Sequence, residues 1–342
     1  MINKLIAYFY ISTIFILKKI FRTEINSELF FNIYHKPYWS IFYTIVKDFK
    51  LQDLENYSFI RIDIEKELFE KYEIIPECFF DPFYFCDESK NKEYIFFEIS
   101  YFDLKLKKYK SGDIFFVYKK KLENTWNYGG KIINSEIKIS FPQIINFENN
   151  IYMIPETSCD NEVSLYKSTC ENFPNTWKKD KILLRGKDFQ DPVFFKKDDI
   201  YYLFVSTDQD KFLRIYFSEH LINNDFIEHP LSPVYKLDYT ARAAGNFFEI
   251  ENKLIRPSQY KFHGNQILFH EIKKLSKTEF EEVNVNELKK LKNNLYAENG
   301  VHHINVNRFN DGYLILLDGN FLKPHFYHNV KTNLYAKSNK SN

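Results

Sequence analysis

Glycine is scarce in this chain, with 9 residues among 342, against an average share of about 7% in proteins. The sequence contains no G-x-G-x-x-G and no G-x-x-x-x-G-K-[ST], the motifs whose backbone holds dinucleotides and triphosphates. It also lacks the G-x-S-x-G nucleophile elbow and the H-E-x-x-H zinc motif. These absences exclude the usual signatures of nucleotide-binding proteins, α/β-hydrolases and zinc proteases, and we expect no cofactor.

An excess of either charge is lacking as well. The chain has 47 Lys and Arg against 46 Asp and Glu, for a formal net charge of +1, so the basic excess typical of a nucleic-acid partner is missing. Its four cysteines (Cys78, Cys86, Cys159 and Cys170) form no C-x-x-C pair and match no zinc spacing. We therefore predict reduced thiols in a cytoplasmic protein, with no nucleic-acid partner and no structural zinc.

The uncharged run at residues 5–17 (LIAYFYISTIFIL) is short, since a helix that spans a bilayer needs about 20 apolar residues. Lysines flank the run, and no small-residue cleavage site follows it. Two interpretations stay open. The run packs on the domain as a helix, or residues 5–22 lie on the inner membrane face as a peripheral contact.

One phrase occurs five times along the chain. Each copy has an opening dipeptide, a short apolar strand, a polar turn typical of a tight hairpin, and a second apolar strand that ends on a polar residue. The copies lie at residues 81–98, 141–156, 191–206, 244–259 and 301–318. A third apolar strand follows each of the first four copies, and a large aromatic residue follows that strand.

Five units with about four strands each predict an all-β fold, a five-bladed β-propeller. A β-sandwich with coincidental hairpins is the alternative. A propeller must close its ring to avoid exposed sheet edges, and we expect residues 38–46 (YWSIFYTIV) to form a strand that joins the last blade. The predicted domains are a partly helical lead-in at residues 1–37 and a propeller at 38–340. Outside the lead-in, helix is expected chiefly at the lysine-rich residues 285–293.

Equivalent positions of the repeats converge on the axis of a propeller, where chemistry can gather. The residues that this alignment brings together are Asp81, Glu98, Glu156, Asp191, Arg242, Arg256, Gln259, His302 and His303. Carboxylates in different environments can serve as acid and base, and crowding should raise the pKa of at least one of them. Each residue also has a structural interpretation, as a turn cap or as a buried ionic or hydrogen-bonded partner. No metal ligand is assigned, although a calcium ion on the axis stays open.

Three of the longer phrases resemble a known family. Residues 141–157 (FPQIINFENNIYMIPET), 241–259 (ARAAGNFFEIENKLIRPSQ) and 300–319 (GVHHINVNRFNDGYLILLDG) are similar to the N-terminal propeller domain found in plant glucosamine inositolphosphorylceramide transferase and in many bacterial proteins. The D-P-h-h-F and Y-Y-L-F phrases more distantly resemble the propellers of glycoside hydrolase families 43 and 32.

The resemblance implies a carbohydrate-active protein that cleaves or transfers a glycosyl unit in surface-polysaccharide or glycolipid assembly. It implies Asp81 as base or nucleophile and Asp191 as a stabilising group, and Glu156 is the candidate acid. The residues expected to bind the carbohydrate or glycolipid substrate are Glu98, Arg242, Arg256, Gln259, His302 and His303. The alternative is a non-catalytic glycan-binding or scaffold module that works with a separate glycosyltransferase, so hydrolase, transferase and binding functions all stay open.

Overall fold

The computed structural model describes residues 35–133, 137–168, 171, 173–235, 240–261, 265–292, 294 and 297–324. The apolar run at residues 5–17 and nearly all of the predicted lead-in lie outside these residues. One compact unit covers Tyr38–Phe321, and residues 1–37 and 322–342 make up a second. Within the described ranges, no helix is both long and apolar enough to cross a bilayer.

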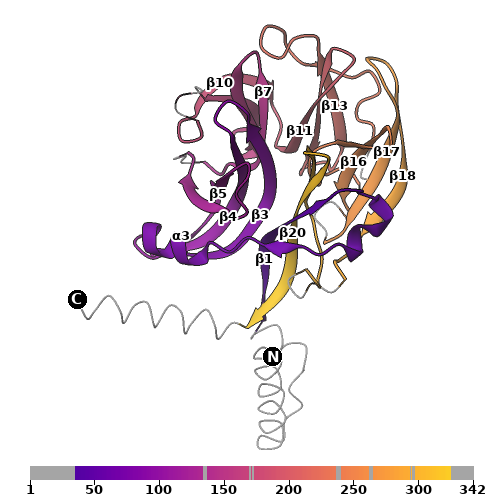
Figure 1. Ribbon diagram of the computed structural model, residues 1–342. Coiled ribbons are helices and arrows are strands. Elements are labelled where there is room, and N and C mark those ends of the chain that lie inside the picture. The colour runs from indigo at the N-terminus through magenta and orange to yellow at the C-terminus, as the bar shows by residue number, and fades with distance from the viewer. Residues whose placement is uncertain are drawn as a thin grey trace, which may run out of the picture. The chain divides into compact units, whose positions relative to one another are not determined.

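The unit Tyr38–Phe321 is a β-propeller, with its sheets set around a common axis (Figure 1). Three of its sheets have four antiparallel strands each. The first sheet contains β7 (Ser140–Phe147), β8 (Asn150–Thr157), β9 (Glu162–Ser168) and β10 (Lys178–Arg185). The second contains β11 (Phe189–Lys197), β12 (Ile200–Thr207), β13 (Leu213–Ser218) and β14 (Ile227–Glu228). The third contains β15 (Phe248–Ile250), β16 (Lys253–Gln259), β17 (Ile267–Leu275) and β18 (Phe280–Leu288).

The remaining sheet has eight strands and joins the two ends of the repeat. Its order is β19 (Ile304–Phe309), β20 (Gly312–Pro324), β1 (His35–Val46), β3 (Ile74–Asp87), β4 (Lys92–Asp103), β5 (Lys108–Lys120) and β6 (Asn127–Lys131), with β2 (Ile60–Arg61) paired to β1. The strand predicted at residues 38–46 is therefore present beside β20, and it also runs parallel to β3. All five predicted hairpins form, and β1 joins the first and the last into one sheet.

The helix expected at residues 285–293 is wrong for the described residues 285–292. Residues 285–288 belong to β18, where 286–288 pair with β17, and residues 289–292 form no helix. The polar and β-branched residues of this strand suit an outer sheet edge. The described helices lie elsewhere, at α3 (Glu65–Tyr72) and in the short 3-10 segments η1 (Leu51–Asn56) and η2 (Ser158–Asp160). Helix α3 buries Leu68 and ends at Tyr72. The next residue, Glu73, caps the helix with a left-handed φ of 54°.

Three of the five hairpins carry a bulge at their opening positions. Asp81, Phe141 and Asp191 have positive φ angles of 50°, 51° and 42°, each precedes a proline, and the strand register shifts at each position. In the fourth repeat, Gly245 has a φ of 122°. A bulge re-aims side chains out of the regular alternation of a strand. Asp81 and Asp191 thereby face the cavity, whereas Phe141 stays in the core. Strained backbone of this kind is concentrated at functional sites.

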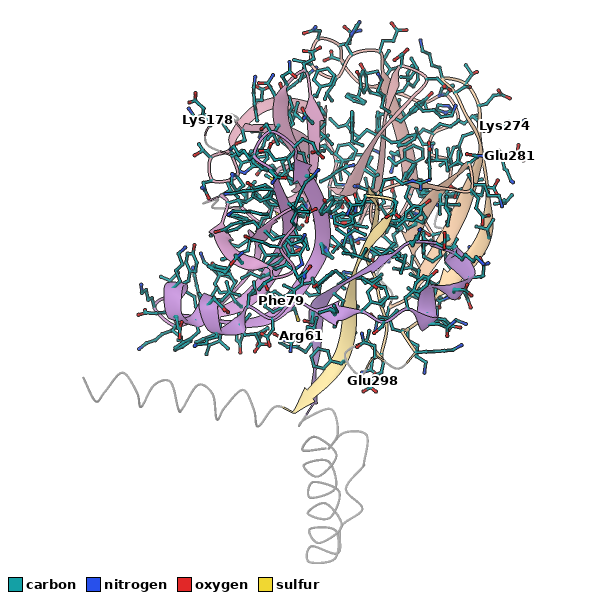
Figure 2. The ribbon with its side chains drawn as sticks, viewed as in Figure 1. Arg61, Phe79, Lys178, Lys274, Glu281 and Glu298 are labelled. Carbon is teal, nitrogen blue, oxygen red and sulfur yellow. The ribbon has the colours of Figure 1, made fainter. Side chains whose placement is uncertain are left out.

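The sheets pack through aromatic residues and expose charge at their outer strands. Phe79, which is 1% exposed, packs edge-on against Tyr38 at a ring distance of 6.4 Å. Figure 2 shows Phe79 inside the packing, whereas Lys274 and Glu281 project from the outer part of the molecule. These two lie opposite each other on β17 and β18, and their charged groups are 3.5 Å apart. A separate set of buried polar residues lies at the start and end positions of the hairpins.

Candidate functional site

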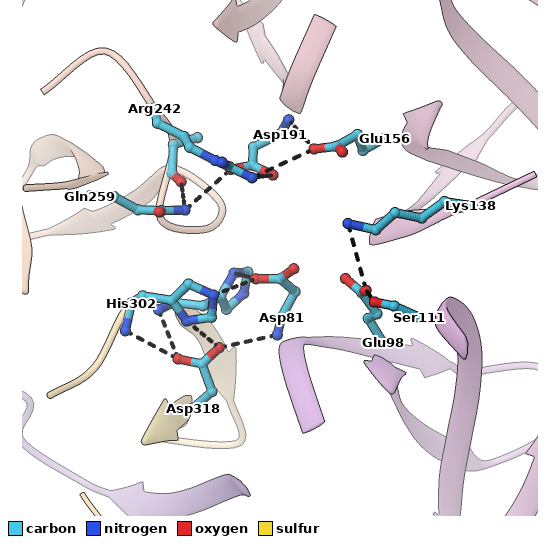
Figure 3. A network of polar contacts seen from close by, with 12 residues as sticks. Asp81, Glu98, Ser111, Lys138, Glu156, Asp191, Arg242, Gln259, His302 and Asp318 are labelled. Carbon is cyan, nitrogen blue, oxygen red and sulfur yellow. Dashed lines mark hydrogen bonds and ion pairs between the residues drawn. The ribbon is translucent and has the colours of Figure 1, made fainter. Parts of the chain in front are cut away.

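A cavity of about 310 Å³ lies where the bulged hairpin starts meet. Six of the predicted site residues line it: Asp81, Glu98, Asp191, Arg242, Gln259 and His302. The lining is completed by Trp39, Phe80, Ser111, Lys138, Ser140 and Asn265. Figure 3 shows the polar residues in three groups, around Asp81, around Asp191 and around Glu98.

The first group holds Asp81 in an ionised state. Oδ1 of Asp81 lies 3.2 Å from Nδ1 of His303 and 3.8 Å from Nε2 of His302. Burial raises the pKa of Asp81, but the hydrogen bond to His303 and the charges of both imidazoles and Arg242 outweigh burial and hold the pKa at about 2. Asp318 fixes the backbone, because its carboxylate accepts the N–H groups of Asp81 (3.2 Å), His302 (3.1 Å) and His303 (2.9 Å).

His302 lies between two carboxylates. Its Nδ1 is 2.7 Å from Oδ2 of Asp318, and burial lowers its pKa less than Asp318 raises it, so the pKa of His302 is about 9. Candidate ligand atoms of Asp81, His302 and Asp318 lie within 4.8 Å of one another, a set that has the composition of a metal site. A protonated His302 supplies a cation between these carboxylates.

The second group surrounds Asp191. Its Oδ2 accepts hydrogen bonds from Nε of Arg242 (2.5 Å) and from Nε2 of Gln259 (3.1 Å). Its backbone N–H donates to Oε2 of Glu156 (3.0 Å), which lies 3.9 Å from Nη2 of Arg242. Burial, followed by the charge of Asp191, raises the pKa of Glu156 to about 7. Arg242 is the cation that these two buried carboxylates share.

The third group surrounds Glu98, at the end of the first hairpin. Its Oε1 accepts a hydrogen bond from Oγ of Ser111 (3.0 Å) and lies 3.8 Å from Nζ of Lys138. Burial raises the pKa of Glu98 to about 7, and the charges of Asp81 and Glu156 add to this effect against the opposing charge of Lys138. Glu98 and Glu156 thus meet the expectation of a raised carboxyl pKa.

A glycine gives Lys138 room to approach. Gly112 has a φ of 84°, and a Cβ atom at this position would lie 2.0 Å from Cγ of Lys138. The next residue, Ile139, donates its N–H to the Gly112 carbonyl at 2.9 Å. In a chain with so few glycines, this one permits the close approach that brings an ammonium group beside Glu98.

The residues that close the hairpins have different roles. Glu156 accepts the backbone N–H of Asp191, and Asp318 accepts that of Asp81, so each carboxylate binds the opening Asp of the next hairpin. Glu98 is followed by a hairpin that opens with Phe141, and its carboxylate binds Ser111 and faces the cavity instead. Two equivalent carboxylates therefore join neighbouring repeats, and a third is available to a ligand.

Three of the predicted site residues are not in the lining. Arg256 is 1% exposed and is held by Glu282, with Nε–Oε2 at 2.7 Å and Nη2–Oε1 at 2.5 Å. It lies three residues before Gln259 on β16, and residues with this spacing point to opposite faces of a strand. Glu156 lies behind Asp191, and His303 is fully buried against Asp81.

Sequence reasoning missed several residues of the cavity. Asp318 lies behind the lining and binds the backbone of Asp81 and His302. It occupies a closing position of the repeat, and that equivalence to Glu156 could have revealed its role. Ser111 and Lys138 lie outside the repeated phrases, where no periodic signal marks them. Trp39 lies on the strand that was expected only to close the ring.

The family described as "Glucosamine inositolphosphorylceramide transferase 1, N-terminal" matches residues 71–320. The chain belongs to this family. It is 32% identical over 212 residues to glucosamine inositolphosphorylceramide transferase 1 of Oryza sativa subsp. japonica, covering 57% of this chain and 28% of that protein. The protein of the same name from Arabidopsis thaliana is 30% identical over 210 residues, covering 57% and 27%. The chain thus matches less than a third of the length of these relatives.

Solved structures with a similar fold include two glycoside hydrolases. The GH43_1 enzyme from Xanthomonas citri, complexed with xylotriose, has a TM-score of 0.48 and 11% identity, covering 72% of this chain and 87% of that one. Zg3597, a family 117 glycoside hydrolase produced by Zobellia galactanivorans, has a TM-score of 0.46 and 13% identity, covering 83% and 90%.

Proposed function

We propose that the cavity binds a sugar, and that Asp81 and Glu98 act as base and acid in the cleavage or transfer of a glycosyl unit. The observation that carries the proposal is that two carboxyl groups line one cavity with widely separated pKa values, about 2 for Asp81 and about 7 for Glu98. Such a separation assigns the two halves of acid–base catalysis. Glycoside chemistry commonly uses a carboxyl pair of this kind.

Glu98 is the proton donor in this proposal. Near neutral pH a substantial fraction of Glu98 is protonated, and its proton passes to the glycosidic oxygen as the bond to the sugar carbon breaks. Asp81 is ionised, and it either takes a proton from the incoming hydroxyl group or attacks the sugar carbon itself. Lys138, beside Glu98, favours its return to the ionised form after the proton has left.

The acid is thus Glu98 rather than Glu156, the residue favoured by the sequence. Glu156 accepts hydrogen bonds from the N–H of Asp191 and from Oγ of Ser158 (3.0 Å), and it does not line the cavity. Its role in the proposal is to position Asp191, which with Gln259 faces the sugar hydroxyls. Oε1 of Gln259 is buried without a hydrogen-bond partner among the described residues, and a sugar hydroxyl would satisfy it.

The substrate class follows by analogy with the relatives. Their name describes a glucosamine inositolphosphorylceramide transferase, and we infer that this chain also acts on a glycolipid or a related glycoconjugate. It would do so in surface-polysaccharide or glycolipid assembly, alone or beside a separate glycosyltransferase. The second candidate is a glycan-binding module, in which the same cavity holds the sugar and no bond is broken.

Turnover of activated aryl glycosides by the full chain, together with binding to an array of oligosaccharides, tests the proposal. We compare wild type with Asp81→Asn, Glu98→Gln and a control, Glu162→Gln, which changes a buried carboxylate that binds Lys179 outside the cavity. The proposal predicts turnover that both cavity variants reduce at least about a hundredfold and the control leaves intact. Oligosaccharide binding without turnover supports the binding module. The absence of both binding and turnover would refute a sugar site.

A further inference from the structure

Trp39 forms an aromatic wall of the cavity that the acid–base proposal does not use. The indole lies 4.5 Å from the ring of His302 and 5.8 Å from the ring of Phe80, measured between centroids. Phe80 and His302 are themselves 5.6 Å apart with their planes at 73°. All three line the cavity, and Trp39 and Phe80 are half-buried, so part of each ring is open to a ligand.

The indole is held in a fixed orientation. Strand β1 lies between β20 and β3, and Trp39 pairs with Cys78 of β3 in parallel register. The imidazole beside it is fixed in turn by Asp318, 2.7 Å from its Nδ1. A rigid platform loses little conformational entropy when a ligand lies on it, which favours affinity.

The remainder of the cavity is polar. Glu98, Lys138 and Gln259 present a carboxyl, an ammonium and an unpartnered amide oxygen to the same space. A ligand that suits both parts needs an apolar face for the rings and hydroxyl groups at its edges. A hexopyranose has this form, because its C–H bonds gather on one face of the ring and its hydroxyls project around it.

We propose that Trp39 is the platform on which the sugar ring stacks, and that it sets which hexopyranoside this chain accepts. This inference rests on the proposed sugar site and adds its specificity. Trp39 precedes residues 71–320, the segment that matches the family. The platform is therefore supplied by the strand that closes the ring in this chain, outside the matched segment.

Binding to an oligosaccharide array, followed by titration of the strongest-binding oligosaccharide, tests the role of Trp39 in the full chain. The variants are Trp39→Ala, Trp39→Phe and the control Trp126→Ala, whose indole packs on Tyr43 outside the cavity. We expect Trp39→Ala to weaken binding at least tenfold, which corresponds to about 1.4 kcal/mol. Trp39→Phe should keep most of the affinity with a changed preference among terminal hexoses, and Trp126→Ala should bind as wild type does.

Tryptophan fluorescence supplies a second measurement if Trp39→Ala fails to fold. The chain has three tryptophans, and titration of the same oligosaccharide should change the emission of wild type but not of Trp39→Phe. The platform would be overturned if folded Trp39→Ala binds as tightly as wild type does, or if the emission of Trp39→Phe changes on titration as much as that of wild type. The sugar site would remain in either case. An array on which wild type binds nothing would instead remove the proposed function, and the platform with it.

Discussion

Replacement of Glu98 by glutamine should stabilise the protein at neutral and alkaline pH. The pKa of Glu98 is raised from 4.5 to about 7 in the folded chain, so the folded state binds this proton more tightly than the unfolded state does. The stability that the group contributes is therefore fully present below about pH 4.5 and is lost as the pH rises through about 7. Glutamine keeps the shape of the acid without the charge and avoids this loss.

The size of the effect follows from the shift. Each pKa unit corresponds to about 1.4 kcal/mol, so a rise from 4.5 to about 7 costs the folded state about 3 kcal/mol once Glu98 is ionised. We expect Glu98→Gln to gain up to this amount over wild type at pH 8 and almost nothing at pH 4.5. For a domain of this size, 1 kcal/mol moves the Tm by roughly 2–4 °C.

Chemical denaturation of wild type and Glu98→Gln at intervals from pH 4.5 to pH 8 measures this difference. Glu162→Gln is the matched control. Burial raises the pKa of Glu162, but Lys179 and Ser164 outweigh burial and lower it, so its stabilising contribution is present above the unfolded pKa and is lost toward acid. The control should be less stable than wild type at pH 8. A free-energy difference between Glu98→Gln and wild type that does not change with pH would refute the reasoning, because Glu98 would then be solvated.

Three further predictions concern buried contacts of the propeller. Arg242→Met should lower the free energy of unfolding by about 3–5 kcal/mol, because two buried carboxylates lose their shared cation, and addition of Asp191→Asn should recover part of the loss in the same denaturation assay. Arg256→Ala should lower the Tm while any oligosaccharide binding stays unchanged, since its guanidinium binds Glu282 away from the cavity. Gly112→Ala should displace Lys138, whose Cγ lies 2.0 Å from the position of the added Cβ, and reduce aryl glycoside turnover.

The fold was accessible from sequence because the hairpin is a local structure repeated five times. Apolar alternation and turn residues predict each hairpin, and the need to close the ring predicts the strand at residues 38–46. The helix α3 was not predicted, because residues 65–72 carry only a weak apolar pattern with one fully buried leucine. The expected helix at 285–293 failed because lysine content says little about a strand at a solvated edge.

The site was predicted in outline and not in detail. The repeat alignment identified Asp81, Asp191 and Gln259 because equivalent positions converge on the axis. It failed for Arg256, whose side chain leaves the opposite face of β16. Lys138 is placed by a backbone contact with Gly112 between segments that no repeat relates, so no periodic signal could have identified it.

The asymmetry of the repeat leaves one closing carboxyl group, that of Glu98, facing the cavity. Glu156 and Asp318 each accept a hydrogen bond from the backbone N–H of the aspartate that opens the next hairpin. Both carboxylates therefore link neighbouring repeats. The hairpin after Glu98 opens with Phe141 instead, whose ring packs between Phe83 and His303 at 4.8 Å and 5.3 Å. Because no aspartate opens this hairpin, Glu98 faces the cavity beside Lys138. A repeat with five identical units would bind every closing carboxylate in the same way. Under the proposed function, the departure from symmetry leaves Glu98 available as the acid.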